Sequence, residues 1–121
     1  MSRASVILVE DEALIRMMLV DMIEELGHRV IAVAGDVTDG YALAQQEEYD
    51  LAILDINLQG LHVQPVAEAV VARGLPLLFV TGYGPAGVPP TLRECRVLTK
   101  PCLTRELKTA INGILSQTQA S

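Results

Sequence analysis

Residues 51–60 have the sequence LAILDINLQG, in which four apolar residues run directly into the carboxylate of Asp55. Apolar side chains at consecutive positions, without alternation, are typical of a strand that is covered on both faces of a parallel sheet. Asn57, Gln59 and Gly60 follow the acid, so the strand ends there. An acid at this place is either a solvated loop residue or a group positioned for chemistry.

Similar apolar runs recur along the chain, with segments of helical periodicity between them. The patterns predict strands at 5–9, 29–34, 51–54, 75–80 and 95–98, and helices at 12–26, 37–47, 62–73 and 104–117. Such alternation predicts an α/β fold with one doubly wound, five-stranded parallel sheet, right-handed crossovers and helices on both faces. We expect residues 1–121 to form a single domain with its core in 5–117.

Composition excludes several classes of function. Fifteen acidic and nine basic residues give a net charge of −6, which argues against a nucleic-acid-binding surface. No apolar run approaches the roughly 18 residues of a membrane span, and no signal peptide is recognisable, so we expect a cytoplasmic protein. Cys95 and Cys102 are then expected to be reduced thiols.

The connection between the fourth and fifth strands, residues 81–94, differs from the other crossovers. It contains three glycines and three prolines, which discourage a helix before residue 90. We expect a loop followed by a short or distorted fourth helix near 89–94.

Polar side chains follow the predicted strands where the carboxyl ends of parallel strands meet. Their positions are Glu10, Asp11, Asp55, Thr81 and Lys100. In an open parallel sheet, ligands bind at this edge. Three acids, a hydroxyl and an amine from distant segments are an improbable coincidence, so we interpret them as one site.

The charges of this site indicate its chemistry. Two carboxylates about 4 Å apart repel by roughly 4 kcal/mol at an effective dielectric constant of about 20. A hard cation such as Mg²⁺ cancels this repulsion with oxygen ligands, and on this argument Asp11→Ala should stabilise the metal-free protein. A cation, the Lys100 ammonium and a hydroxyl together suit a phosphoryl group, and a carboxylate can be its acceptor.

The segments ILVEDE, LDINLQG, FVTGYG and LTKPC resemble the signatures of the receiver domain of bacterial response regulators, which has a flavodoxin-like (βα)5 fold. The resemblance implies that Asp55 is the phosphoacceptor, that Thr81 is the switch hydroxyl and that Lys100 binds the phosphoryl group. It also implies a cis peptide bond before Pro101.

The same resemblance implies a Mg²⁺ site formed by Glu10, Asp11, Asp55 and the backbone carbonyl of Asn57. The donor of the phosphoryl group would be a sensor histidine kinase or a histidine phosphotransfer protein. Since no output domain is expected, the receiver would act through a protein contact, or as a phosphate shuttle or sink.

FVTGYG and the proline-rich loop after it are similar to the FATGUY subgroup of single-domain receivers. As in that subgroup, the family's aromatic residue three positions before the lysine is missing, and Val97 takes its place. Cys102 replaces the common phenylalanine after the proline. We therefore expect the signal to leave through the 81–94 loop, where Tyr83 either shields the phosphoryl group or moves when it arrives.

The predicted helix 12–26 carries more apolar residues than a core face needs. At 100° per residue the inward stripe contains Ile15, Leu19, Met22, Ile23 and Leu26, while Leu14, Met17 and Val20 lie outside it and Met18 lies at its edge. Exposed apolar residues are ordinary, but methionine is adaptable in partner contacts. In receivers this helix docks the phosphodonor, so we assign a partner face to Leu14, Ile15, Met17 and Met18.

Two alternative functions remain open at this level. A phosphohydrolase of the haloacid-dehalogenase type uses similar groups, but it places its nucleophile on the first strand and its acid pair last. A degenerate receiver that is never phosphorylated is disfavoured by the complete acid, threonine and lysine set. His28 and His62 are interpreted as surface histidines and not as metal ligands.

Overall fold

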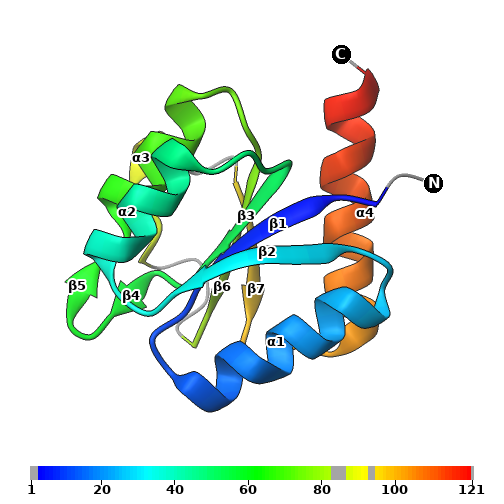
Figure 1. Cartoon of the computed structure of the whole chain (residues 1–121), viewed down its shortest axis with the longest axis horizontal. Coiled ribbons are helices and arrows are strands. Elements are labelled where there is room, and N and C mark those ends of the chain that lie inside the picture. Colours follow the sequence, from blue (N-terminus) through cyan, green and yellow to red (C-terminus); the bar gives the residue numbers. More distant parts are fainter. Residues whose placement is uncertain (1–2, 83–86, 93–94, 121) are drawn as a thin grey trace.

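The computed structural model describes residues 3–82, 87–92 and 95–120 (Figure 1). Its central sheet has the order β2-β1-β3-β6-β7, and all four neighbouring pairs are parallel. The strands are β1 (Ser5–Val9), β2 (Arg29–Ala34), β3 (Leu51–Leu54), β6 (Leu77–Thr81) and β7 (Arg96–Thr99). The five-stranded, doubly wound sheet of the flavodoxin type is therefore confirmed.

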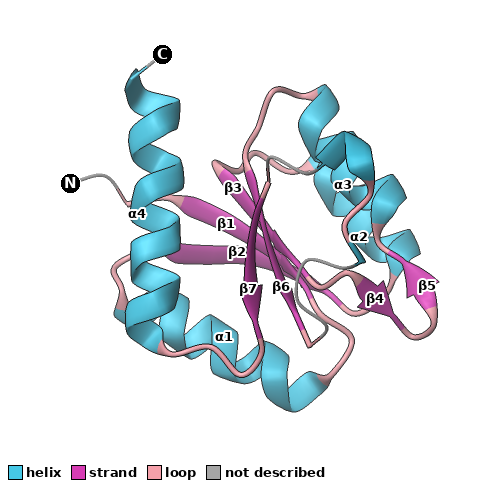
Figure 2. Cartoon of the chain, turned by 180° about the vertical axis from the view of Figure 1, so that it is seen from behind, coloured by secondary structure: helices cyan, strands magenta, loops and turns pink. Residues whose placement is uncertain are grey.

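Helices cover both faces of this sheet. The helices α1 (Ala13–Glu25) and α4 (Thr104–Ala120) lie on one face, and α2 (Val37–Gln46) and α3 (Gln64–Ala72) lie on the other (Figures 1 and 2). Each predicted helix is present, with its ends within three residues of the expected positions. Asp36 begins α2, because its side chain accepts a hydrogen bond from the backbone N–H of Asp39 at 2.8 Å.

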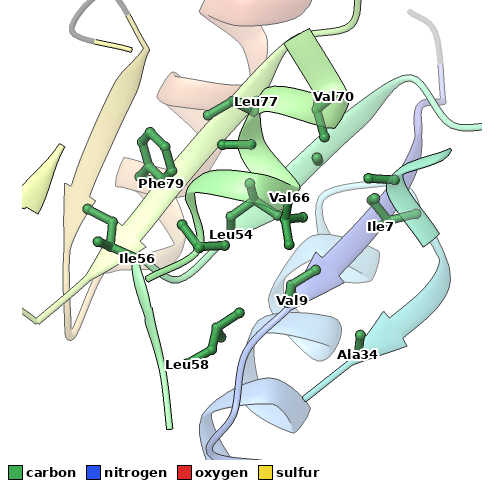
Figure 3. Close-up of a cluster of buried hydrophobic side chains, with 14 of the residues drawn as sticks. Ile7, Val9, Ala34, Leu54, Ile56, Leu58, Val66, Val70, Leu77 and Phe79 are labelled. Carbon is green, nitrogen blue, oxygen red and sulfur yellow. The ribbon is translucent and has the colours of Figure 1, made fainter. Parts of the chain in front are cut away.

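The sheet separates two hydrophobic cores. Neighbouring residues of a strand point to opposite faces, so Leu54 and Phe79 pack with Val66 and Val70 of α3 (Figure 3). On the other face, side chains of the same strands pack against α1 and α4; this second core includes Leu8, Ile53, Leu78, Ile23 and Ile111. Both cores are almost entirely aliphatic, as the composition predicts.

A small hairpin after β3 was not predicted. The strands β4 (Asn57–Leu58) and β5 (Leu61–His62) pair antiparallel around a turn in which Gln59 and Gly60 have φ of 53° and 85°. Because residues 61–62 belong to this hairpin, α3 begins at Gln64 and not at residue 62. The hairpin is tied to the residues after β1, because the N–H of Gln59 donates to Asp11 at 2.9 Å.

The connection after β6 has little regular structure in its described part. A 3₁₀ helix, η2 (Pro90–Leu92), is the short helix expected near 89–94. Tyr83 lies outside the described residues. Among the described residues, no helix is long and apolar enough to span a membrane.

Candidate functional site

Four strands deliver the predicted site residues to one edge of the sheet. Glu10 and Asp11 follow β1, Asp55 follows β3, Thr81 ends β6 and Lys100 follows β7. Carboxylate oxygens of the three acids lie within 4.8 Å of one another. The expected convergence is therefore present.

Glu10 is the most deeply buried acid, with 1% of its surface exposed. Its backbone N–H donates to the carbonyl of Ala34 at 3.0 Å, which fixes the end of β1 beside β2. Its Oε2 accepts a hydrogen bond from the backbone N–H of Glu12 at 3.0 Å. Burial raises the pKa of Glu10, and the neighbouring Asp55 also raises it, while the Lys100 ammonium and the Glu12 N–H oppose this change.

Lys100 lies between the two buried carboxylates. Its Nζ is 2.6 Å from Oε1 of Glu10 and 2.9 Å from Oδ2 of Asp55. Only the contact to Asp55 is aligned as a hydrogen bond, so the buried Oε1 of Glu10 has an ion pair but no hydrogen-bond partner. Burial lowers the pKa of Lys100, but the contacts to Glu10 and Asp55 outweigh burial and raise it. Lys100 is therefore an ammonium at neutral pH.

Asp55 and Thr81 are held by the backbone of the sheet. The N–H of Asp55 donates to the carbonyl of Val9 at 2.9 Å, and the N–H of Lys100 donates to the carbonyl of Thr81 at 2.8 Å. Asp55 is 7% exposed and Thr81 is 1% exposed. Thr81 is opposite Thr99 in the register of β6 and β7, and the Lys100–Pro101 peptide bond is cis, as the resemblance implied.

Asp11 is bonded to the β4–β5 hairpin, since its Oδ2 accepts the backbone N–H of Gln59 at 2.9 Å. Burial raises the pKa of Asp11, but hydrogen bonds, with that from Gln59 the strongest, outweigh burial and lower it. The fold thus favours the ionised form of this group. Carboxylate crowding alone led to the opposite expectation for Asp11→Ala.

The three acids fit a divalent cation. Their donor atoms are all carboxylate oxygens, which Mg²⁺ prefers. Lys100, ion-paired with Glu10 and Asp55, balances part of the negative charge of the cluster. The side chain of Asn57 does not contribute to this cluster, because its Oδ1 accepts the N–H of Gly60 at 2.9 Å.

Arg16 on α1 is a site neighbour that the sequence analysis missed. Its Nη1 donates to the backbone carbonyl of Glu10 at 2.6 Å. It lies against Gly35, where a Cβ atom would come within 3.1 Å of Nη1. The glycine after β2 was the available signal, but the sequence alone does not connect it with α1.

Three of the four predicted partner residues of α1 are exposed beside the site. Leu14, Met17 and Met18 are 73%, 65% and 55% exposed. A cavity of about 220 Å³ opens next to them, between the Ile15–Met22 part of α1 and the Lys100–Cys102 segment. Val20 was expected outside the inward stripe but packs against the core, together with Ile15.

The two histidines differ from each other. The prediction of a surface position is wrong for His28, which is 7% exposed and accepts the N–H of Ala4 on Nδ1 at 3.1 Å. Burial lowers its pKa. His62 is exposed, as expected, and both of its ring nitrogens are hydrogen-bonded. Neither belongs to the acidic cluster.

The comparisons with known proteins agree with this geometry. A family model described as the response regulator receiver domain matches residues 6–112. The solution structure of SdrG from Sphingomonas melonis is 37% identical, with a TM-score of 0.84, and the match covers 95% of this chain and 99% of that one.

More distant relatives extend the comparison. The transcriptional regulatory protein PdtaR of Mycobacterium tuberculosis is 29% identical over 93% of this chain, which spans 57% of that relative's length. The receiver domain of a sensor histidine kinase from Pseudomonas aeruginosa, described with a magnesium ion in its active site cleft, is 21% identical. Its TM-score is 0.77, and the match covers 95% of this chain and 99% of that one.

Proposed function

Because the chain belongs to the response regulator receiver family of two-component systems, we propose that Asp55 accepts a phosphoryl group from a phosphohistidine. A carboxylate oxygen of Asp55 forms the new bond to phosphorus as the bond between phosphorus and the donor imidazole breaks. The products are an acyl phosphate on Asp55 and a neutral histidine on the donor, whose ring takes the electron pair of the broken bond and carries its proton on the other nitrogen. The observation that carries this proposal is the Lys100 ammonium 2.9 Å from a nearly buried Asp55.

Each neighbouring group has a role in this proposal. Glu10, Asp11, Asp55 and the carbonyl of Asn57 would hold Mg²⁺, which would neutralise charge on the phosphoryl oxygens. Lys100, which is hydrogen-bonded to Asp55, pairs with the phosphoryl oxygens in this proposal. The Thr81 hydroxyl donates to the phosphoryl group on Asp55 after a movement of the end of β6.

The donor docks on α1 in this proposal. A sensor histidine kinase or a histidine phosphotransfer protein covers Leu14, Ile15, Met17 and Met18, which lie next to the cavity that reaches Lys100. FVTGYG and Val97 support membership of the FATGUY subgroup. We expect a cytoplasmic protein, whose output is a protein contact or a phosphate shuttle or sink. The family match disfavours the haloacid-dehalogenase alternative.

The first prediction tests the acceptor. With acetyl phosphate and Mg²⁺, the wild-type protein gains one acid-labile, hydroxylamine-sensitive phosphoryl group, and Asp55→Asn gains none. Asp50→Asn is the matched control, because Asp50 precedes the same strand and bonds the N–H of Ser5 at 2.8 Å, away from the site. Intact-mass spectrometry measures the added group. Equal labelling of Asp55→Asn and the wild type would exclude Asp55.

A further inference from the structure

The ring of His62 connects two segments that are far apart in the sequence. Its Nδ1 accepts the backbone N–H of Gln64 at 3.0 Å, at the beginning of α3. Its Nε2 is 2.9 Å from the carbonyl oxygen of Gly87, in the segment after β6. An Nδ1 that accepts leaves the ring proton on Nε2, so the ring donates to Gly87. One tautomer satisfies both bonds.

Gly87 is also held from a second side. A Cβ atom at this position would lie 3.2 Å from Cγ2 of Ile56, so the backbone of Gly87 lies directly on that side chain. Ile56 is 5% exposed and follows Asp55 in the chain. Gly87 is thus fixed between the neighbour of the phosphoacceptor and the ring of His62.

The rest of the 87–92 segment continues from this anchor. Leu92 is buried and Val88 packs against the core between the sheet and the α2 and α3 helices. The turn of the hairpin that carries His62 is bonded to Asp11 of the acidic cluster, through the N–H of Gln59. The His62–Gly87 bond is therefore a polar link between the site's hairpin and the segment that follows Thr81.

We propose that His62 is a positioning residue, a latch that holds segment 87–92 in its unphosphorylated arrangement. The inference rests on the proposed function. Ile56 follows Asp55 and lies against Gly87, so a shift of the backbone at Asp55 changes the position of Gly87 relative to the ring, and the switched arrangement forms after the bond from Nε2 to Gly87 breaks. The His62–Gly87 bond stabilises the unswitched arrangement, so a ligand at Asp55 must overcome the free energy of that bond before the switched arrangement is populated.

The test uses two variants of the full chain. His62→Asn keeps a side-chain acceptor for the N–H of Gln64 but cannot reach Gly87. Gln64→Ala is the matched control, because it removes the side-chain bond to Glu68 and keeps the backbone N–H that His62 accepts. Beryllofluoride with Mg²⁺ serves as the phosphoryl analogue.

A net hydrogen bond of ordinary strength corresponds to about a two- to tenfold change in an equilibrium. His62→Asn should therefore bind beryllofluoride about two- to tenfold more tightly than the wild type, and Gln64→Ala should bind with wild-type affinity. Amide exchange in 87–92 should be faster in unliganded His62→Asn. Unchanged affinity and unchanged exchange in this variant would overturn the latch.

Imidazole ¹⁵N shifts provide a readout that a merely structural role would not give. The unliganded wild type should have the Nε2–H tautomer at His62, and beryllofluoride should break the hydrogen bond from Nε2 to Gly87. A His28→Asn sample assigns the signals, because His62 is then the one histidine left in the sequence. A ring that keeps the same tautomer and shifts in both states would contradict the latch. If the wild type does not bind beryllofluoride, the proposed function fails, while the tautomer and exchange in the unliganded protein still report whether the bond exists.

Discussion

Glu10, Asp55 and Lys100 illustrate how single residues determine the resting state of this molecule. Lys100 is within ion-pair distance of both acids, but only its bond to Asp55 is well aligned. The ammonium therefore compensates part of the charge of both acids. A fixed positive charge at this place suits the phosphoryl oxygens that the proposed reaction would bring to Asp55.

The second prediction concerns Asp11→Ala in EDTA. The pKa of Asp11 in the folded protein lies below its ordinary value of 3.8. The ionised group therefore stabilises the fold above pH 3.8, and this stabilisation is lost as the pH falls through the folded pKa. We expect the variant to lose about 1 kcal/mol at pH 7, the value of one hydrogen bond, and to approach the wild type in acid. Urea unfolding at each pH measures the free energy of unfolding of both proteins.

Asp21→Ala, on the exposed side of α1, is the control for general charge effects. A metal-free Asp11→Ala protein as stable as the wild type, or more stable, would mean that repulsion among the carboxylates outweighs the bond from Gln59.

The third prediction concerns His28, whose folded pKa is lowered by burial. The unfolded chain takes up a proton more readily than the folded one, so stability is full above about pH 6.5 and falls as the pH drops below it. His28→Asn retains an acceptor for the N–H of Ala4 but does not titrate there. Between pH 7.5 and 5.5, urea unfolding should show a smaller loss for His28→Asn than for wild type. Parallel pH profiles would contradict this expectation.

At the scale of elements, two helical glycines make a matched pair for the fourth prediction. Gly113→Ala in α4 should stabilise the protein by about 0.5–1 kcal/mol, because alanine has the higher helix propensity. The three atoms nearest to a Cβ at Gly113 belong to the guanidinium of Arg96, at 2.7–3.1 Å, and this end of a long side chain can shift. At Gly40 in α2 the new Cβ meets Val9 at 3.0 Å and Val66 at 3.3 Å, both in the core. Gly40→Ala should therefore not raise the stability of the protein. Thermal melts of the two variants and the wild type measure the difference.

Elements that the sequence predicts well are those defined by long patterns. Consecutive apolar residues in β3 and β6 predicted buried strands, and the polar residues at their ends, Asp55 and Thr81, were predicted to lie at one edge of the sheet. The β4–β5 hairpin was missed because two residues per strand are too few to form a periodic pattern. The burial of His28 arises from a contact with Ala4, 24 positions away, which no local pattern encodes.

At the scale of the whole molecule, the sheet divides the interior into two cores that share no residue among those described. The fifth prediction is that Val66→Ala and Ile111→Val, which lie in different cores, add within about 0.5 kcal/mol in urea unfolding. Val66→Ala should destabilise by about 1–3 kcal/mol and Ile111→Val by about 0.5–1.5 kcal/mol. Val9→Ala with Val66→Ala is the contrasting pair, because both side chains flank Gly40 and should couple. Strong coupling across the sheet would contradict this picture.

The division into two cores also has a consequence for how such a protein changes over generations. The donor is proposed to dock on α1, whose inner side chains belong to one core, whereas the His62 latch is connected to the other. Substitutions that repack one layer leave the other layer's partners in place. Substitutions that alter the proposed docking helix and substitutions that alter the proposed latch can therefore accumulate independently of each other.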